Sequence, residues 1–349
     1  MPVPQQAACR PDPDTPLTEP GGSRAPAGAG LALPWLVADV GGTNARFGWV
    51  VSPARGVEHV RRFPVAGSAG PAEAVRAYLA GLPADVAAAP RRAAIAVATA
   101  VRGDRVELTN SPWAFSCAEL QTDLGLASLQ VLNDFEALAL SLPRLRPTQW
   151  RAHGAAPVAA GTLAVIGPGT GLGVGGVVQT EAGWVALPGE GGHATLAPSD
   201  DLESEVLRHA RGQWPHVSAE RLLSGIGLPL LHTCVAQAEG RAPEALSAEQ
   251  VVERGVAGDA ACARTLDVFC ALLGGFAGNV ALTLGARAVF IGGGIVPRLG
   301  DRFFTSPFRA RFEAKGRFSD YLAAVPTALI TDTLAALAGA AFAIEQRHG

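Results

Sequence analysis

The organisation of this chain follows from one stretch, Leu36-Val37-Ala38-Asp39-Val40-Gly41-Gly42-Thr43-Asn44-Ala45-Arg46-Phe47-Gly48-Trp49-Val50. Two apolar runs, 36–40 and 47–50, flank a short polar turn, a pattern that predicts a β-hairpin. Glycine at 41 and 42 lets the backbone approach a ligand closely or adopt positive φ. The donors of Thr43 and Asn44 favour an anion-binding nest, and the Asp39 carboxylate suits a hydrated Mg²⁺ on a phosphate. An ordinary hairpin turn explains the stretch equally well, so the stretch alone leaves both interpretations open.

The composition is typical of a globular protein. Of 349 residues, 48% are hydrophobic and 17% are charged, which is enough chain for one large domain or for two lobes with their own cores. The net charge of −3 creates no attractive field for polyanions, so we expect neither nucleic acid nor an acidic membrane surface as a partner. No apolar run is expected to reach the ~18 residues of a membrane span.

Cysteine and lysine usage narrows the chemistry. The five cysteines are scattered and none forms a C-x-x-C pair, which favours neither a zinc ribbon nor a disulfide framework and suits a reducing cytoplasm. Lys315 is the only lysine, so the chain has no G-x-x-x-x-G-K-[ST] loop, and a Schiff-base enzyme is not expected. If the protein handles phosphate, it must use backbone N–H groups, Mg²⁺ and arginine.

Hydrophobic periodicity predicts alternating strands and helices, hence an α/β protein with a mixed sheet in its first lobe. Residues 1–34, rich in Pro, Gly, Ala and Ser, are expected to be a disordered extension without a secretory signal. Strands are expected at 57–65, 93–98, 102–108, 129–132, 162–166, 289–291 and 325–330. Helices are expected at 72–82, 117–125, 201–210, from 218 onward, within 244–286, at 304–317 and at 334–345, the last returning to the first lobe.

A polar pair closes one of these strands. The run Leu129-Gln130-Val131-Leu132 ends at Asn133-Asp134, and a helix follows at once. Ligands of α/β sheets bind outside the carboxyl ends of strands, which is where this pair is placed. Capping of the helix by Asn133 or Asp134 is an equally good explanation of the pair taken singly.

The segment from Thr162 to Val178 repeats the pattern of the opening stretch, since a β run meets the turn Gly169-Thr170-Gly171 and a second β run follows. We interpret it as a second phosphate loop, in a second lobe across a cleft. Gly171, Gly173 and Gly176 also satisfy the dinucleotide fingerprint G-x-G-x-x-G, which must follow a strand and open a helix. Here Val174 to Leu187 predicts a hairpin instead, which disfavours a dehydrogenase.

Further polar groups follow. Glycines on both sides of Glu190 leave its carboxylate accessible, and His193 is three residues away; a surface glutamate and a structural histidine are the alternatives. Glu220 is expected in the first turn of a helix, where the macrodipole favours a carboxylate regardless of function. A third glycine loop, Gly292-Gly293-Gly294, follows the strand 289–291 and could place bare backbone against a base or ribose.

Taken together these motifs resemble the bacterial glucokinase family of the hexokinase–actin superfamily. The resemblance runs in order from about residue 36 to the C-terminus. Its motifs are 39–46, Thr109-Asn110 with Trp113-Ala114-Phe115, Asn133-Asp134-Phe135, 169–173, 187–193, 216–221, 292–298 and 312–318.

The resemblance implies a two-lobed hexokinase/actin-like (ribonuclease H-like) α/β fold, with mixed sheets flanked by helices and the active site in the interlobe cleft. It places a small lobe at 35–143 plus 335–349 and a large lobe at 144–334, after the extension 1–34. It implies ATP-dependent phosphorylation of the 6-hydroxyl of glucose, the first step of glycolysis, by a cytoplasmic homodimer. No metal ligand set is implied beyond Mg²⁺ carried by ATP, near Asp39.

The resemblance also assigns residues. Asp134 would be the general base, and Asn133, Asp134, Glu190, His193 and Glu220 would bind the sugar. ATP would contact Asp39, Val40, Gly41, Gly42, Thr43, Asn44, Gly169, Thr170, Gly171, Gly293 and Gly294. A carboxylate base and Mg²⁺ are what phosphoryl transfer requires.

Two other functions remain open, namely a kinase for another hexose and a sugar-sensing regulator without catalysis. The intact Asn133-Asp134 pair and both phosphate loops argue against the regulator. The chain departs from the family's pattern at Ala98-Thr99-Ala100 and at 333–337, which affects the adenine side and the hinge. Residues 194–198 contain no cysteine, so the zinc motif of the related repressor–kinase group is not expected.

Overall fold

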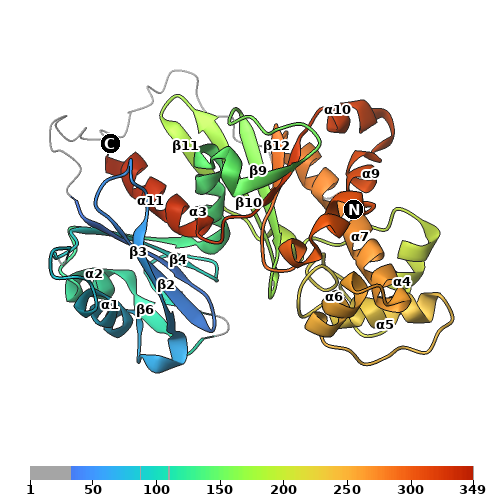
Figure 1. Ribbon diagram of the computed structural model, residues 1–349, viewed down its shortest axis with the longest axis horizontal. Helices are drawn as coiled ribbons and strands as arrows, with labels where there is room; N and C mark the ends of the chain where they lie inside the picture. Colours follow the sequence, from blue (N-terminus) through green and yellow to red (C-terminus); the bar gives the residue numbers. More distant parts are fainter. Residues whose placement is uncertain (1–32, 87, 109–110, 349) are drawn as a thin grey trace, which may run out of the picture.

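The computed structural model describes residues 33–86, 88–108 and 111–348 of the chain. Most of the predicted extension and the Thr109-Asn110 motif lie outside the described residues. The described chain forms two large sheets and a small two-stranded ribbon. Figure 1 shows the first sheet on one side, the second sheet in the middle and a group of helices, α4 to α10, on the other side. This is the α/β arrangement with flanked mixed sheets that the sequence predicts.

The first sheet has the strand order β3-β2-β1-β4-β7. The predicted hairpin is confirmed, because β1 and β2 pair antiparallel with Asp39 opposite Arg46. Strands β1, β4 and β7 are parallel, and their register aligns Val40 with Val97 and Val97 with Asn133. Their carboxyl ends therefore share one edge. The strands are β1 Trp35–Val40, β2 Asn44–Val50, β3 Glu58–Pro64, β4 Arg92–Val97 and β7 Ser128–Asn133.

The second sheet has the order β11-β10-β9-β12-β13-β8. Strands β9 and β12 are parallel, with Ile166 opposite Ile291, so the glycine loops that follow them lie at the same edge. Strands β10 and β11 form the predicted hairpin, and Gly173 and Gly176 lie inside β10, which confirms that the dinucleotide fingerprint lacks its helix. The strands are β8 Trp150–His153, β9 Thr162–Pro168, β10 Leu172–Thr180, β11 Gly183–Leu187, β12 Ala288–Ile291 and β13 Thr327–Ile330.

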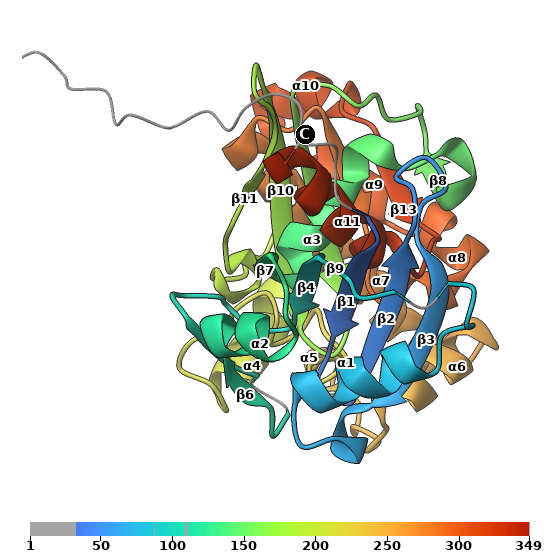
Figure 2. The ribbon, with the colours of Figure 1, turned by 90° about the vertical axis from the view of Figure 1, so that its left-hand side faces the viewer.

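Helices cover both sheets. Helix α11 packs on α3, β1 and β4, the return to the first lobe that the sequence predicts, and Figure 2 shows α1 and α2 beside the strands of the first sheet. The domain boundaries themselves stay a prediction. The helices are α1 Pro71–Ala80, α2 Cys117–Asp123, α3 Asp134–Ser141, α4 Asp201–Arg211, α5 Leu228–Ala238, α6 Ala248–Val256, α7 Ala260–Leu284, α8 Asp301–Thr305, α9 Phe308–Glu313, α10 Ser319–Ala323 and α11 Ala335–His348; the ribbon is β5 Arg105–Glu107 with β6 Ala114–Ser116.

Helix α7 corrects one sequence expectation. Its 25 residues are long and apolar enough, by length and composition, to cross a membrane, so the expectation that no stretch qualifies was wrong. However, 83% of its most apolar window is buried inside the protein. Leu266, Phe269 and Leu273 are fully buried in the core of the second part of the chain. The apolar composition of α7 is therefore explained by the core.

The helix expected at 304–317 is broken into α8, α9 and a short helical turn at 316–318. Pro307 interrupts it because proline lacks the N–H that a continuous helix needs. Gly316 lies at φ +55°, a conformation that ends regular helix. The expected single helix was therefore wrong in continuity.

Candidate active site

Two largely buried carboxylates lie at the shared edge of the first sheet. Asp39 is the penultimate residue of β1, and Asp134 begins α3 directly after β7. Burial raises the pKa of Asp39. The Arg46 guanidinium, which lies 3.4 Å from Oδ2 of Asp39, lowers this pKa but has the smaller effect. Burial also raises the pKa of Asp134 to about 7, with further contributions from the negative charges of Asp39 and Glu190. Three carboxylates from different segments thus share one electrostatic environment, with the Arg46 guanidinium beside Asp39.

Asn133 caps α3. Its Oδ1 accepts hydrogen bonds from the N–H groups of Phe135 at 2.9 Å and Glu136 at 3.4 Å, and its Nδ2 donates to the carbonyl of Thr99 at 3.2 Å. The Glu136 carboxylate accepts the N–H of Asn133 in return, which completes a capping box. The capping interpretation is therefore confirmed, and sugar binding by Asn133 stays a prediction.

Phe135 packs α3 against the second sheet, a role that the sequence did not predict for this residue. A methyl group added to Gly167 or Gly173 would overlap the Phe135 ring, and one added to Gly175 would come within 2.6 Å of the Phe135 carbonyl oxygen. These glycines of β9 and β10 therefore leave the space that the ring fills. The available signal in β10 was glycine at the alternate positions 173 and 175, because alternate residues of a strand face one side.

Glu220 joins the sugar-side loop to the second glycine loop. Its Oε2 accepts the N–H of Leu172 at 2.9 Å, and its Oε1 lies 3.9 Å from Nδ1 of His193. A methyl group on Gly171 would collide with this carboxylate. The predicted residues 171, 193 and 220 are thus brought together. The carbonyl of Glu190 accepts the N–H of His193 at 3.0 Å, and the negative charge of Glu190 contributes to the raised pKa of Asp134.

The helix expected to begin at Ser218 is absent, so that prediction was wrong. The N–H groups of Gly225 and Ile226, which a helix beginning at Ser218 would direct to its own carbonyls at 221 and 222, donate instead to the carbonyls of Gly169 and Thr170, at 2.8 and 3.3 Å. The next helix begins only at Leu228. Without a helix terminus, the macrodipole does not explain the carboxylate of Glu220.

The glycine loops of the second sheet pack against one another. The N–H of Gly225 donates to the Gly169 carbonyl at 2.8 Å, and that of Ile295 donates to the Pro168 carbonyl at 3.1 Å. Gly293 has φ +78°, and a methyl group there would overlap the Pro168 carbonyl, so the fold itself requires this glycine. At Gly169 and Gly294 a methyl group would meet no atom within 4 Å. Those two glycines leave bare backbone facing open space.

The turn after β1 differs from expectation in two details. Neither Gly41 nor Gly42 is among the glycines at positive φ in the described residues, so that use of the pair was wrong. The N–H of Gly41 donates to the Asn44 carbonyl at 2.9 Å, which removes one donor from the expected nest. A methyl group on Gly41 would meet only that same oxygen, at an ordinary 3.6 Å. The chain's own packing therefore does not require glycine at 41.

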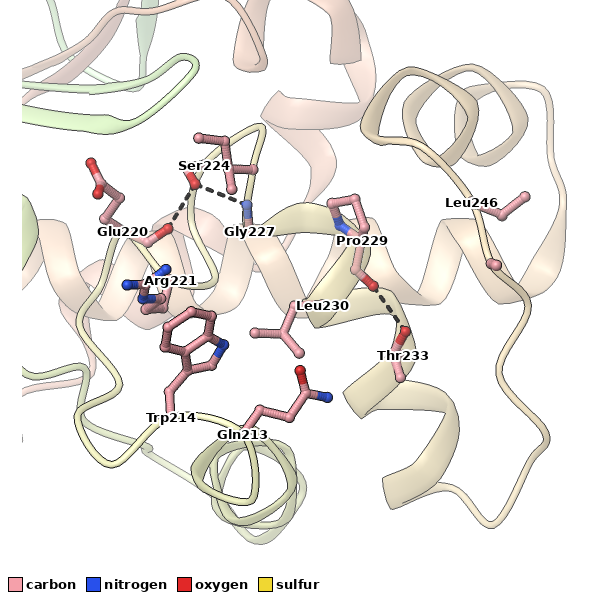
Figure 3. A pocket seen from close by; sticks show the side chains of 12 residues that line it. Gln213, Trp214, Glu220, Arg221, Ser224, Gly227, Pro229, Leu230, Thr233 and Leu246 are labelled. Atoms are coloured by element: carbon pink, nitrogen blue, oxygen red, sulfur yellow. Dashed lines mark hydrogen bonds between the residues drawn. The ribbon is translucent and has the colours of Figure 1, made fainter. Parts of the chain in front are cut away.

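A cavity of about 620 Å³ opens beside Glu220 and continues along α5 (Figure 3). Trp214 forms one wall. The guanidinium carbon of Arg221 lies over the Trp214 ring, 3.7 Å from the ring centroid. Ile226, on the same cavity, donates its N–H to the carbonyl of Thr170 at 3.3 Å. Leu230 projects into the cavity from α5. A partly apolar space therefore adjoins both the Glu220 carboxylate and the second glycine loop.

Comparison with known proteins identifies the family. The glucokinase family model matches residues 36–347. A glucokinase of Aromatoleum aromaticum is 49% identical, with 92% of this chain and 97% of the relative covered. A glucokinase of Neisseria meningitidis serogroup C is 46% identical, with coverage of 89% and 95%. The crystal structure of a glucokinase from an Antarctic psychrotroph superposes with a TM-score of 0.82 at 38% identity, covering 89% of this chain and 98% of that one. The fold is thus the predicted two-lobed hexokinase-like fold, and the chain belongs to the glucokinase family.

Proposed function

We propose that the protein transfers the γ-phosphoryl group of ATP to the 6-hydroxyl of D-glucose, giving glucose 6-phosphate and ADP as the first step of glycolysis. The observation that carries this proposal is the buried Asp134 carboxylate, with a pKa of about 7, at the meeting point of the two sheets. Family membership sets the reaction class, and the residues below are assigned from their geometry.

Asp134 is the general base. A pKa near neutrality gives a base that is substantially ionised at working pH and still binds a proton well. As the sugar oxygen forms its bond to the γ-phosphorus and the bond to ADP breaks, the hydroxyl proton passes to Asp134. The Phe135 N–H donates to Oδ1 of Asp134 at 3.0 Å, and the Phe135 ring is held by the glycines of β9 and β10. The base is therefore held by both parts of the protein.

Glu190, His193, Glu220 and Asn133 bind the sugar hydroxyls. The Leu172 N–H orients Glu220, because it donates to one oxygen of that carboxylate at 2.9 Å. The His193 side chain is 61% exposed, so it is accessible to a ligand. Directional acceptors and donors of this kind reject sugars that lack a hydroxyl, because the buried partner is then left unpaired.

ATP lies against the loops where bare backbone faces open space. Gly41, Gly42, Thr43 and Asn44, with Asp39 and Val40, approach the phosphates from the first sheet. Gly169, Thr170 and Gly171 do so from the second sheet, with Gly293 and Gly294 toward the adenosine. The cavity beside Ile226 has room for part of the nucleoside. The feature that supports this placement is glycine at 41, 169 and 294, where the fold does not require it.

Mg²⁺ fits this environment. Asp39 is a buried carboxylate whose pKa is raised, and carboxylate oxygen is a preferred Mg²⁺ ligand. Asp39 would hold the ion through its water or directly, together with ATP phosphates. Bound there, the ion would supply positive charge that neutralises the phosphates.

We also propose that the enzyme is a cytoplasmic homodimer. Sedimentation velocity tests whether the chain forms a dimer.

The test is a coupled assay with glucose, ATP and Mg²⁺, run on the native chain and on D134A. Turnover of D134A should fall by about a thousandfold or more, while calorimetry should show retained glucose binding. Retained turnover would refute the base assignment. A hexose panel of glucose, fructose and mannose separates the substrates, and a better rate on another hexose would overturn glucose.

A further inference from the structure

A second cavity, of about 600 Å³, lies on the two connections between the sheets. One connection, 142–149, joins α3 to β8, and the other, 331–334, joins β13 to α11. Both line the cavity, and its remaining walls include the loop 53–57 between β2 and β3 and one face of α11. Figure 2 shows this loop and α11 beside β8 and β13. No residue assigned above to sugar or nucleotide lines this space.

Hydrogen bonds tie the two connections into one unit. The carbonyl of Gln149 accepts the N–H of Thr331 at 2.9 Å. The side-chain amide of Gln149 donates to the Asp332 carboxylate, and its oxygen accepts the Arg146 N–H at 2.9 Å. A change in the angle between the two sheets must therefore move this unit against the loop 53–57 and α11.

The floor of the cavity is apolar and its rim is charged. The floor is formed by Val50, Val57, Leu334, Ala338, Ala341 and Phe342. At the rim, Arg55 pairs with Glu58 and Arg144 pairs with Glu345, each at 2.7 Å. The Arg144 guanidinium also stacks on Phe342, 4.3 Å from the ring centroid. These two arginines are therefore already neutralised within the protein.

Arg146 is different. It lines the cavity and is exposed, and its guanidinium Nε reaches only the neutral Gln149 side chain, at 3.3 Å. Across the described ranges 33–86, 88–108 and 111–348, none of the ion pairs includes Arg146. The cavity thus combines an apolar floor with an arginine that forms no ion pair among the described residues. The Asp332 carboxylate also lines the cavity, where it accepts hydrogen bonds from the Gln149 amide and the Leu334 N–H.

We propose that this cavity binds a small organic anion with a flat apolar body and a single phosphate, sulfonate or carboxylate group. The body covers the apolar floor, and the anionic group receives charge-assisted hydrogen bonds from Arg146. Because the walls come from the first sheet, from α11 and from both connections, the ligand fits one interlobe angle better than another. A ligand that prefers one conformation shifts the population toward it and alters glucose affinity by the same coupling free energy.

The binding test uses 1-naphthyl phosphate and the full chain, with Mg²⁺ and a non-hydrolysable ATP analogue present to fill the nucleotide site. Calorimetry should show saturable 1:1 binding. R146Q should weaken it about tenfold or more, and A341W, which fills the floor from α11, should abolish it. R105Q is the matched control, because it removes an exposed arginine of β5 that does not line the cavity. Absence of 1:1 binding, or binding that R146Q and A341W leave unchanged, overturns the site.

The coupling test measures glucose affinity directly, by isothermal titration calorimetry, with and without saturating 1-naphthyl phosphate. Affinity should change about fivefold or more in the native chain and stay constant in R146Q and A341W. Unchanged glucose affinity in the native chain would overturn the coupling. The coupling rests on the proposed function, but anion binding does not. Since neither readout involves turnover, failure of the cavity proposal is distinguishable from failure of the kinase assignment.

Discussion

Replacing Asp134 by asparagine should make the protein more stable at neutral and alkaline pH, although it removes the proposed base. The carboxylate is buried near Asp39 and Glu190, and these features raise its pKa to about 7 from an ordinary 3.8. Asparagine keeps an Oδ1 that can accept the Phe135 N–H, which Oδ1 of Asp134 accepts at 3.0 Å in the native chain. The substitution therefore removes a charge and retains the local hydrogen bond.

The sign follows from proton linkage. Between the unfolded pKa of 3.8 and the folded pKa of about 7, the folded state binds more protons than the unfolded state, so the free energy of unfolding falls as pH rises through this window. A displacement of this size corresponds to a loss of about 4 kcal/mol of folding free energy, which is complete above the folded pKa and absent below the unfolded one. We expect D134N to exceed the native chain by about 2–4 kcal/mol near pH 8 and to match it near pH 4.

The assay is the thermal midpoint of each protein from pH 4 to pH 8.5, without sugar, nucleotide or Mg²⁺. D259N is a control of opposite sign. The Cys262 N–H and the Arg254 guanidinium lower the pKa of Asp259, so its contribution is present at neutral pH and lost as pH falls through the lowered pKa. D259N should therefore be less stable than the native chain near pH 7. A D134N difference that is the same at pH 4 and pH 8 would refute the reasoning for Asp134.

Three further predictions concern the site. E220Q should raise the KM for glucose at least about tenfold, because the amide cannot match a carboxylate as acceptor of sugar hydroxyls; an unchanged KM in steady-state assays would remove Glu220 from the sugar site. G169A should fold with a normal thermal midpoint but raise the KM for ATP. G293A should lower the midpoint, because its methyl group meets the Pro168 carbonyl. Equal midpoints for the two variants would contradict the different roles given to these glycines. G173A should be destabilised by about 1–3 kcal/mol through overpacking against Phe135, and F135L combined with G173A should recover part of that loss in a double-mutant cycle. Additive effects of the two substitutions would show that the ring and the glycine do not share space.

Much of the architecture was predictable from local patterns. The hairpin after Trp35, the strand that ends at Asn133 and the hairpin that spoils the G-x-G-x-x-G fingerprint all depend on residues close in sequence. The helix expected at Ser218 failed, because the N–H groups of Gly225 and Ile226 pair with carbonyls of the loop at 169–170, more than fifty residues earlier. Periodicity carries no information about such a partner. The expected helix at 304–317 failed for a local reason, because Pro307 interrupts it. The prediction followed the hydrophobic periodicity and gave too little weight to this proline.

The sequence by itself determined which side chains and bare backbone loops carry the chemistry, because turn glycines, caps and strand ends obey short-range sterics and hydrogen bonding. It also contained the ordered motifs that identify the family. Only the tertiary structure decided that the Glu220 carboxylate binds the Leu172 N–H and that Gly173 accommodates the Phe135 ring. It also decided that burial, with the charges of Asp39 and Glu190, raises the pKa of Asp134. It likewise decided that Arg146 faces an apolar cavity. These features arise from contacts, burial and charge between residues distant in sequence, and those interactions depend on separation in space.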